Sequence, residues 1–170
     1  MLGALRKFSD RFTDVLGYAA GVLTLLVLLN VFYDATARYF FRTGSIALQE
    51  MEWHLFSLLF LFGIAYALKE DGHVRVDLIY SRLGPRAKAS INLLGAFLFL
   101  IPLAVLIIHG SLPFVWEAYQ VGEISGDPGG LTHRWLIKAA IPLSFLFLLL
   151  TTVGFVIRNL SVFGKSRARN

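Results

Sequence analysis

Long apolar segments constrain this chain more than any other feature of its sequence. Residues 15–33 are interrupted only by Thr24 and Asn30, and three further segments follow at residues 50–68, 89–108 and 133–157. A helix needs roughly 20 apolar residues to cross a hydrocarbon core of about 30 Å. With 56% hydrophobic residues and a mean hydropathy of +0.67, the chain is more apolar than soluble domains are. We therefore predict an all-α integral membrane protein with four transmembrane helices in a single membrane domain, residues 1–170.

The residues before the first span have an amphipathic pattern. Leu5, Phe8 and Phe12 lie on one face of a helix, among charged neighbours. This pattern predicts a short N-terminal interfacial helix that leads into the first span. A cleaved signal peptide is the alternative, because residues 35–37 (Ala-Thr-Ala) resemble a cleavage site. The apolar run is longer than a signal core, however, and three more spans follow.

The basic residues are divided unequally between the two sides of the predicted membrane. With four crossings, twelve Lys and Arg residues fall on the side of both termini and of residues 69–88, and four fall on the other side. The positive-inside rule then places both termini and the connection 69–88 in the cytoplasm. The basic surplus is explained by this topology and by contact with anionic membrane lipid, so nucleic-acid binding is not indicated.

The sequence has few polar groups that could perform chemistry within the membrane. Phosphate-binding glycine loops, paired central carboxylates, nucleophile–base pairs and cysteines are absent. Asn30 and Asn92 are expected to hydrogen-bond between helices, and Lys138 is expected to extend toward the membrane surface. No acidic residue lies at mid-membrane depth, where ion-coupled carriers usually need one. These features argue against an enzyme and against a complete transporter.

The second predicted span begins with three ionisable residues, Glu50, Glu52 and His54. The apolar part behind them, residues 55–68, gives roughly 21 Å of helix, which is shorter than a core of about 30 Å. Glu50 and Glu52 are two residues apart, so they point in nearly opposite directions on a helix. We expect the Glu50 face, which includes Trp53 and His54, to pack on another helix, and Glu52 to lie nearer water or headgroups.

All three tryptophans, Trp53, Trp116 and Trp135, fall at the outer ends of predicted helices. One interpretation is an aromatic belt at the membrane surface. The other is a docking surface for an external partner.

Two groups of residues are candidates for a bound metal or cofactor. His54 and His109 are predicted at similar depth near the outer surface, where two imidazoles could ligate a haem in the membrane anchor of a redox complex. Glu70, Asp71, His73 and Asp77 could form a metal site on a helix, where His73 and Asp77 are four residues apart. However, Arg75 lies among them, and the alternation with valines favours an extended segment. We therefore expect neither a metal nor a cofactor, and the haem anchor is the alternative to the function given below.

Residues 66–78, with the sequence YALKEDGHVRVDL, are the most distinctive stretch of the chain. With the patterns around it, this stretch resembles the small membrane subunit of tripartite ATP-independent periplasmic (TRAP) transporters, the DctQ type. The other matching features, in order, are Glu50, Glu52 and Trp53 at the start of the second span, the turn at residues 83–86, residues 127–131, residues 135–138 and the Pro142-Leu143 pair. The resemblance covers about residues 10–160, and its specificity comes from the ordered set.

The resemblance implies a small scaffold permease subunit of a secondary uptake transporter that is driven by a sodium gradient and depends on a binding protein. It implies a carboxylate-type organic solute, no transport by this chain alone, and no enzymatic activity. The partners implied are a large multi-span membrane permease subunit and a periplasmic substrate-binding protein. The implied location is the inner (plasma) membrane of a bacterium or archaeon.

A hypothetical interface with these partners follows from the motif, the tryptophans and the start of the second span. We expect the Glu50 face to pack on a helix of the large subunit. The predicted interface residues are Glu50, Glu52, Trp53, His54, His73, Arg75, Asp77, Trp116, Trp135 and Lys138.

Overall fold

The computed structural model describes residues 2–70, 72, 80 and 82–167, and the regular structure in these residues is helical. In chain order the elements are α1 (Leu2–Phe41), α2 (Ile46–Lys69), α4 (Pro85–Gly95), the π-helical segment η1 (Ala96–Leu100), α5 (Ile101–Gln120) and α6 (Trp135–Arg167). Elements α4, η1 and α5 follow one another without a break. The described part of the chain therefore contains four helices that are long and apolar enough to cross a membrane, and the predicted all-α architecture is confirmed.

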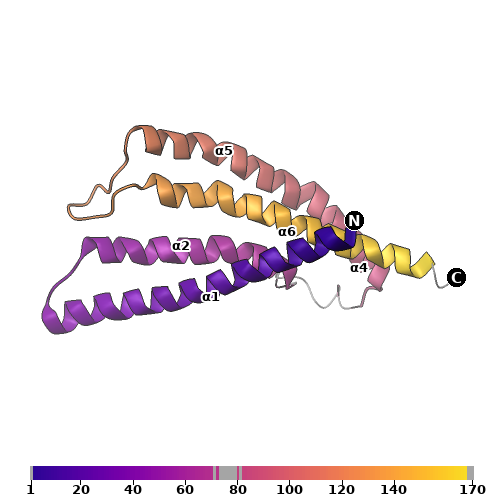
Figure 1. The fold of residues 1–170 in the computed structure, drawn as a ribbon, viewed down its shortest axis with the longest axis horizontal. Coiled ribbons are helices and arrows are strands. Elements are labelled where there is room, and N and C mark those ends of the chain that lie inside the picture. The colour runs from indigo at the N-terminus through magenta and orange to yellow at the C-terminus, as the bar shows by residue number, and fades with distance from the viewer. Residues whose placement is uncertain (1, 71, 73–79, 81, 168–170) are drawn as a thin grey trace.

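The helices are arranged as two antiparallel pairs (Figure 1). Helix α1 packs against α2, α5 packs against α6, and α6 also contacts α1 and α2. The start of α1, the end of α2, the start of α4 and the end of α6 lie at one end of the bundle, which we call the terminal end. The α1–α2 loop, residues 42–45, and the α5–α6 loop, residues 121–134, lie at the other end, which we call the loop end. The count of basic residues on each side of the membrane assumes this arrangement, with both termini and the α2–α4 connection at the same end of the bundle.

Two helices differ in extent from the sequence prediction. Helix α1 runs from Leu2 to Phe41 without a break, so the residues predicted to form a short interfacial helix are the first part of the first long helix. Helix α6 begins at Trp135 and continues to Arg167, well beyond the predicted end at residue 157. Both helices are longer than predicted because the length of an apolar run gives only the part of a helix that lies in lipid. The helix itself continues into polar sequence, where no proline interrupts it, because its polar side chains are compatible with a helix outside lipid.

Proline shapes the third spanning helix. Pro85 lies at the first turn of α4, where its missing N–H removes no helical hydrogen bond. The residues just before Pro102 form the π-helical segment η1 instead of regular α-helix. A proline ring crowds the carbonyl four residues earlier, here that of Leu98, and a wider turn relieves this clash.

Helix α1 packs on α6 through small and hydroxyl-bearing residues. The Ser9 hydroxyl donates to the Leu150 carbonyl at 3.0 Å, and the hydroxyls of Thr13 and Thr151 share a hydrogen bond of 2.9 Å. Gly154 permits this approach, because a Cβ at that position would lie 2.5 Å from the Ser9 hydroxyl oxygen. Helices in lipid associate through such packing and hydrogen bonds, since lipid removes the hydrophobic driving force.

Both asparagines that were predicted to bridge helices do so. The Asn30 amide of α1 donates to the Leu48 carbonyl of α2 at 2.9 Å. The Asn92 amide of α4 donates to the Asn159 side-chain oxygen of α6, also at 2.9 Å. These bonds connect α2 to α1 and α4 to α6. Together with the bonds between α1 and α6, side-chain hydrogen bonds therefore reinforce three helix–helix contacts.

The terminal end is tied together by charged groups. Lys69, the last residue of α2, pairs with Asp14 of α1. Arg158 of α6 donates to the Lys69 carbonyl at 3.1 Å, which places a cation at the C-terminus of α2, where the helix dipole favours positive charge. Three helices thus converge on Lys69.

Candidate functional site

Most of the predicted interface residues lie at the loop end of the bundle (Figure 1). Seven of the ten are on the start of α2, the end of α5 and the start of α6: Glu50, Glu52, Trp53, His54, Trp116, Trp135 and Lys138. The other three, His73, Arg75 and Asp77, lie outside the described residues. The loop end is therefore where a candidate site can be built from the structure.

Glu50 is buried and binds the α5–α6 loop of its own chain. Its carboxylate accepts a hydrogen bond from the Ser125 hydroxyl and another, at 2.6 Å, from the backbone N–H of Leu131. We call these three residues the Glu50 clasp. The packing of a large-subunit helix on the Glu50 face stays a prediction, and in the structure the chain's own loop covers the carboxylate. The reason is that the loop folds back onto α2 and offers two hydrogen-bond donors.

The loop is packed closely enough for the clasp to form. The backbone N–H of Ser125 donates to the Leu131 carbonyl at 2.9 Å, which closes the tight turn that the loop makes at residues 125–130. A Cβ on Gly130 would contact the Ser125 hydroxyl and would lie 2.8 Å from Oε2 of Glu50. Position 130 therefore has no room for a side chain while the carboxylate stays bound.

Trp53 and His54 form a layer of rings beside the clasp. Nδ1 of His54 lies 2.6 Å from the Glu50 carbonyl oxygen, and the imidazole stacks on Trp53 with ring centroids 3.9 Å apart. The Arg134 guanidinium lies over the Trp53 ring, 5.6 Å from its centroid, in cation–π geometry. His109, the second residue of the haem hypothesis, is exposed on α5. The structure gives His54 a packing role next to Glu50.

Glu123 connects the α5–α6 loop to the start of α6. Its carboxylate pairs with Lys138 and lies 3.7 Å from Nε of Arg134, and its carbonyl accepts the Arg134 N–H at 3.1 Å. Lys138 also lies over the Phe114 ring of α5, 3.9 Å from its centroid. Lys138 thus extends toward the loop end, as predicted, and is held there by an anion and a ring.

The other two tryptophans belong to an aromatic cluster on α5 and α6. Tyr119 lies between them, with ring centroids 6.0 Å from Trp116 and 5.4 Å from Trp135. Trp116 is 60% exposed and Trp53 is 40% exposed. Exposed rings at one end of the bundle fit both interpretations of the tryptophans, the aromatic belt and the docking surface.

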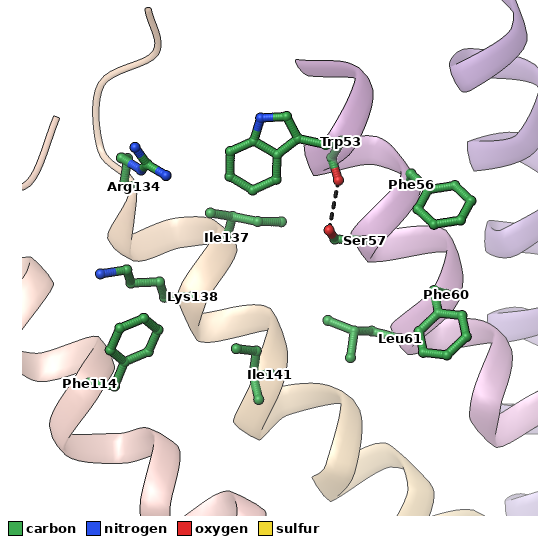
Figure 2. Close-up of a pocket in the computed structure, with 10 residues that line it drawn as sticks. All are labelled: Trp53, Phe56, Ser57, Phe60, Leu61, Phe114, Arg134, Ile137, Lys138 and Ile141. Atoms are coloured by element: carbon green, nitrogen blue, oxygen red, sulfur yellow. Dashed lines mark hydrogen bonds between the residues drawn. The ribbon is translucent and has the colours of Figure 1, made fainter. Parts of the chain in front are cut away.

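A groove of about 410 Å³ lies between α2 and α6 and reaches α5 (Figure 2). Figure 2 shows Trp53 extending from α2 toward Arg134 at the loop end, and Leu61 and Ile141 facing each other further along the helices. Most of its lining is apolar, and its charged residues are Arg134 and Lys138. This groove combines a cationic end with an apolar wall.

Four residues of this site have no clear signal in the sequence: Glu123, Ser125, Gly130 and Arg134. The turn at residues 125–130 is visible from its composition, but nothing in it indicates that Glu50 is its partner. Arg134 counts in the sequence only as one of the few basic residues on its side of the membrane. Their roles follow from contacts between segments that are far apart in the chain.

Four long apolar helices, with charged clusters at the two ends of the bundle, indicate a multi-pass membrane protein. Comparison with known proteins makes the class specific. Residues 23–162 match the family described as "Tripartite ATP-independent periplasmic transporters, DctQ component". A protein of Haemophilus influenzae, provisionally described as a TRAP transporter small permease protein, is 30% identical over 161 residues, which cover 93% of this chain and 98% of that protein. A second H. influenzae protein of the same description is 25% identical over 149 residues, 86% of each chain.

The chain belongs to the DctQ family, the small permease subunits of TRAP transporters. The resemblance drawn from the sequence motifs is thereby confirmed. Family membership makes the chain a transporter component and favours this reading over the haem-binding anchor.

Proposed function

We propose that this chain is the scaffold subunit of a sodium-gradient-driven, binding-protein-dependent uptake transporter for a carboxylate-type organic solute, and that it moves no solute alone. Its partners in this proposal are a large multi-span permease subunit and a periplasmic substrate-binding protein. Membership of the DctQ family supports the proposal, because the family is described as one component of a tripartite system.

The observation that carries the scaffold role is the use of polar groups in the described helices. The hydrogen bonds of Thr13 with Thr151, of Asn30 with Leu48 and of Asn92 with Asn159 each join two helices of this chain. Groups that line a transport path must instead exchange partners with a passing ion or solute. Polar groups that are engaged between helices hold those helices in place, which is what a scaffold requires.

The proposed orientation has both termini in the cytoplasm and the loop end in the periplasm. The positive-inside rule supports it, because the basic residues are concentrated on the side of the termini. The exposed Trp53 and Trp116 and the partly exposed Glu52 then face the compartment from which a binding protein arrives. We propose this surface for docking, with Glu50 and Lys138 stabilising it from below.

Reconstitution tests the proposal. Proteoliposomes are prepared with this chain alone, with the large subunit alone, and with both, and each set receives the binding protein. The solute is a carboxylate that raises the melting temperature of that binding protein. We expect uptake only with both membrane subunits and an inward sodium gradient. Uptake by this chain alone, or equal uptake without sodium, would refute the corresponding part of the proposal.

A further inference from the structure

The groove between α2 and α6 is not explained by the packing of the helices or by the scaffold role. Its apolar wall runs from Trp53 to Leu61 on α2 and from Ile137 to Ile141 on α6, with Arg134 of the α5–α6 loop at its end (Figure 2). Seven helical residues span about 10 Å, so the wall extends roughly that far from the loop end toward the middle of the membrane. A surface of this kind, next to lipid, accepts an apolar chain.

Two cations lie at the loop end of the groove. The backbone N–H of Lys138 donates to the Arg134 carbonyl at 3.3 Å, so the two residues are one helical turn apart and their side chains are neighbours. They share the carboxylate of Glu123, which pairs closely with Lys138 but lies 3.7 Å from Nε of Arg134. Among the described residues, no acceptor makes a hydrogen bond with the buried Nε of Arg134. The Arg134 side chain is 28% exposed and lines the groove, so its guanidinium is within reach of an anion bound there.

The Glu50 carboxylate lies close enough to Arg134 for an electrostatic attraction, but its hydrogen bonds are made to other groups. Both oxygens of Glu50 are taken up by Ser125 and Leu131. An arginine carries five N–H donors in a planar fork that matches the oxygens of a phosphate group, and a neighbouring lysine adds a point charge. The cationic end of the groove is thus suited to a phosphate.

We propose that this groove binds an anionic phospholipid, with its phosphate against Arg134 and Lys138 and one acyl chain along the apolar wall. A phospholipid matches both parts of the groove, because its charged group lies at the depth of the interfacial tryptophans and its chain points toward the membrane centre. A partner's helix is a poorer match. An apolar transmembrane helix brings no anion to Arg134 and Lys138, which share a single carboxylate, that of Glu123.

Native mass spectrometry of the full chain, purified in mild detergent, tests the proposal. We expect the wild-type chain to retain one phosphatidylglycerol in preference to phosphatidylcholine. Arg134→Gln should weaken retention about tenfold, the size of one charge-assisted contact. The control is Arg42→Gln, which removes an exposed cation from the loop end outside the groove, and it should change retention less than about twofold.

A second variant separates lipid binding from any effect of Arg134 on folding. Ser57→Phe places a ring in the groove and alters no charge. In a Trp116→Phe, Trp135→Phe chain, phosphatidylglycerol with brominated acyl chains should quench Trp53 fluorescence, and Ser57→Phe should abolish the quenching at unchanged helicity. Equal retention of the two lipids, equal loss in Arg42→Gln, or unchanged quenching in Ser57→Phe would overturn the proposal. Displacement of the lipid by the co-purified large subunit would overturn it too, since the groove would then be a subunit interface.

Discussion

At the scale of single residues, Glu50 and Glu52 show how two like residues on one helix acquire different surroundings. They lie two positions apart on α2, so they face nearly opposite directions. Glu50 is 8% exposed and accepts two hydrogen bonds from the α5–α6 loop, whereas Glu52 is partly exposed. Burial and hydrogen bonding make Glu50 the residue on which the loop depends.

Glu50→Ala should therefore lower the melting temperature of the purified subunit by several degrees. The substitution leaves the Ser125 hydroxyl and the Leu131 N–H without their acceptor in a partly buried site. Glu52→Ala is the matched control and should shift the midpoint by no more than a degree or two. Scanning fluorimetry in mild detergent measures both. Equal midpoints for the two variants would show that the clasp does not stabilise the loop.

Glycine substitutions in the same loop give a second test. Gly130→Ala should destabilise the chain by about 1–3 kcal/mol, because the new methyl group overlaps Ser125 and approaches Oε2 of Glu50. Gly126→Ala, where no atom lies within 4 Å of the added Cβ, should be close to neutral. Unfolding in mixed detergent micelles measures the difference, and a neutral Gly130→Ala would contradict the packing described here.

At the scale of the elements, hydroxyl groups couple α1 to α6. Hydrogen bonds between membrane helices contribute about 0.6 kcal/mol on average. A double-mutant cycle of Thr13→Val and Thr151→Val should give a coupling energy of about that size. Thr24 donates within α1 to the Ala20 carbonyl, so a cycle of Thr24→Val with Thr151→Val should give none. Coupling of equal size in both cycles would mean that the hydrogen bond between Thr13 and Thr151 is not its cause.

At the scale of the whole molecule, the chain offers a direct test of its orientation in the membrane. It has no cysteine, so a single introduced cysteine reports one position. Ser9 and Ser125 are unsuitable because they are engaged in hydrogen bonds, but Thr43 and Asp127 are exposed at the loop end and Arg82 is exposed beyond α2. An impermeant thiol reagent should label Thr43→Cys and Asp127→Cys in intact cells, and Arg82→Cys only after permeabilisation. The opposite pattern would invert the proposed topology.

Much of this molecule follows from its sequence alone. The apolar segments determined the helical class and the number of spanning helices, because crossing a membrane depends on the length and composition of contiguous residues. The ordered motifs around residues 66–78 determined the family. Asn30 and Asn92 were assigned correctly as bridges, since an amide inside an apolar helix needs a partner.

Only the tertiary structure decided which groups meet at the loop end. Glu50 binds Ser125 and Leu131 across 75 and 81 residues of sequence, and Arg134 reaches Trp53 of another helix. Such pairs depend on how α2, α5 and α6 pack and on how the loop between α5 and α6 folds back. Neither the packing of these helices nor the path of the loop leaves a periodic pattern in the sequence. A single carboxylate, hydroxyl or glycine has the same local sequence signature whether its partner is water, lipid or a distant backbone N–H.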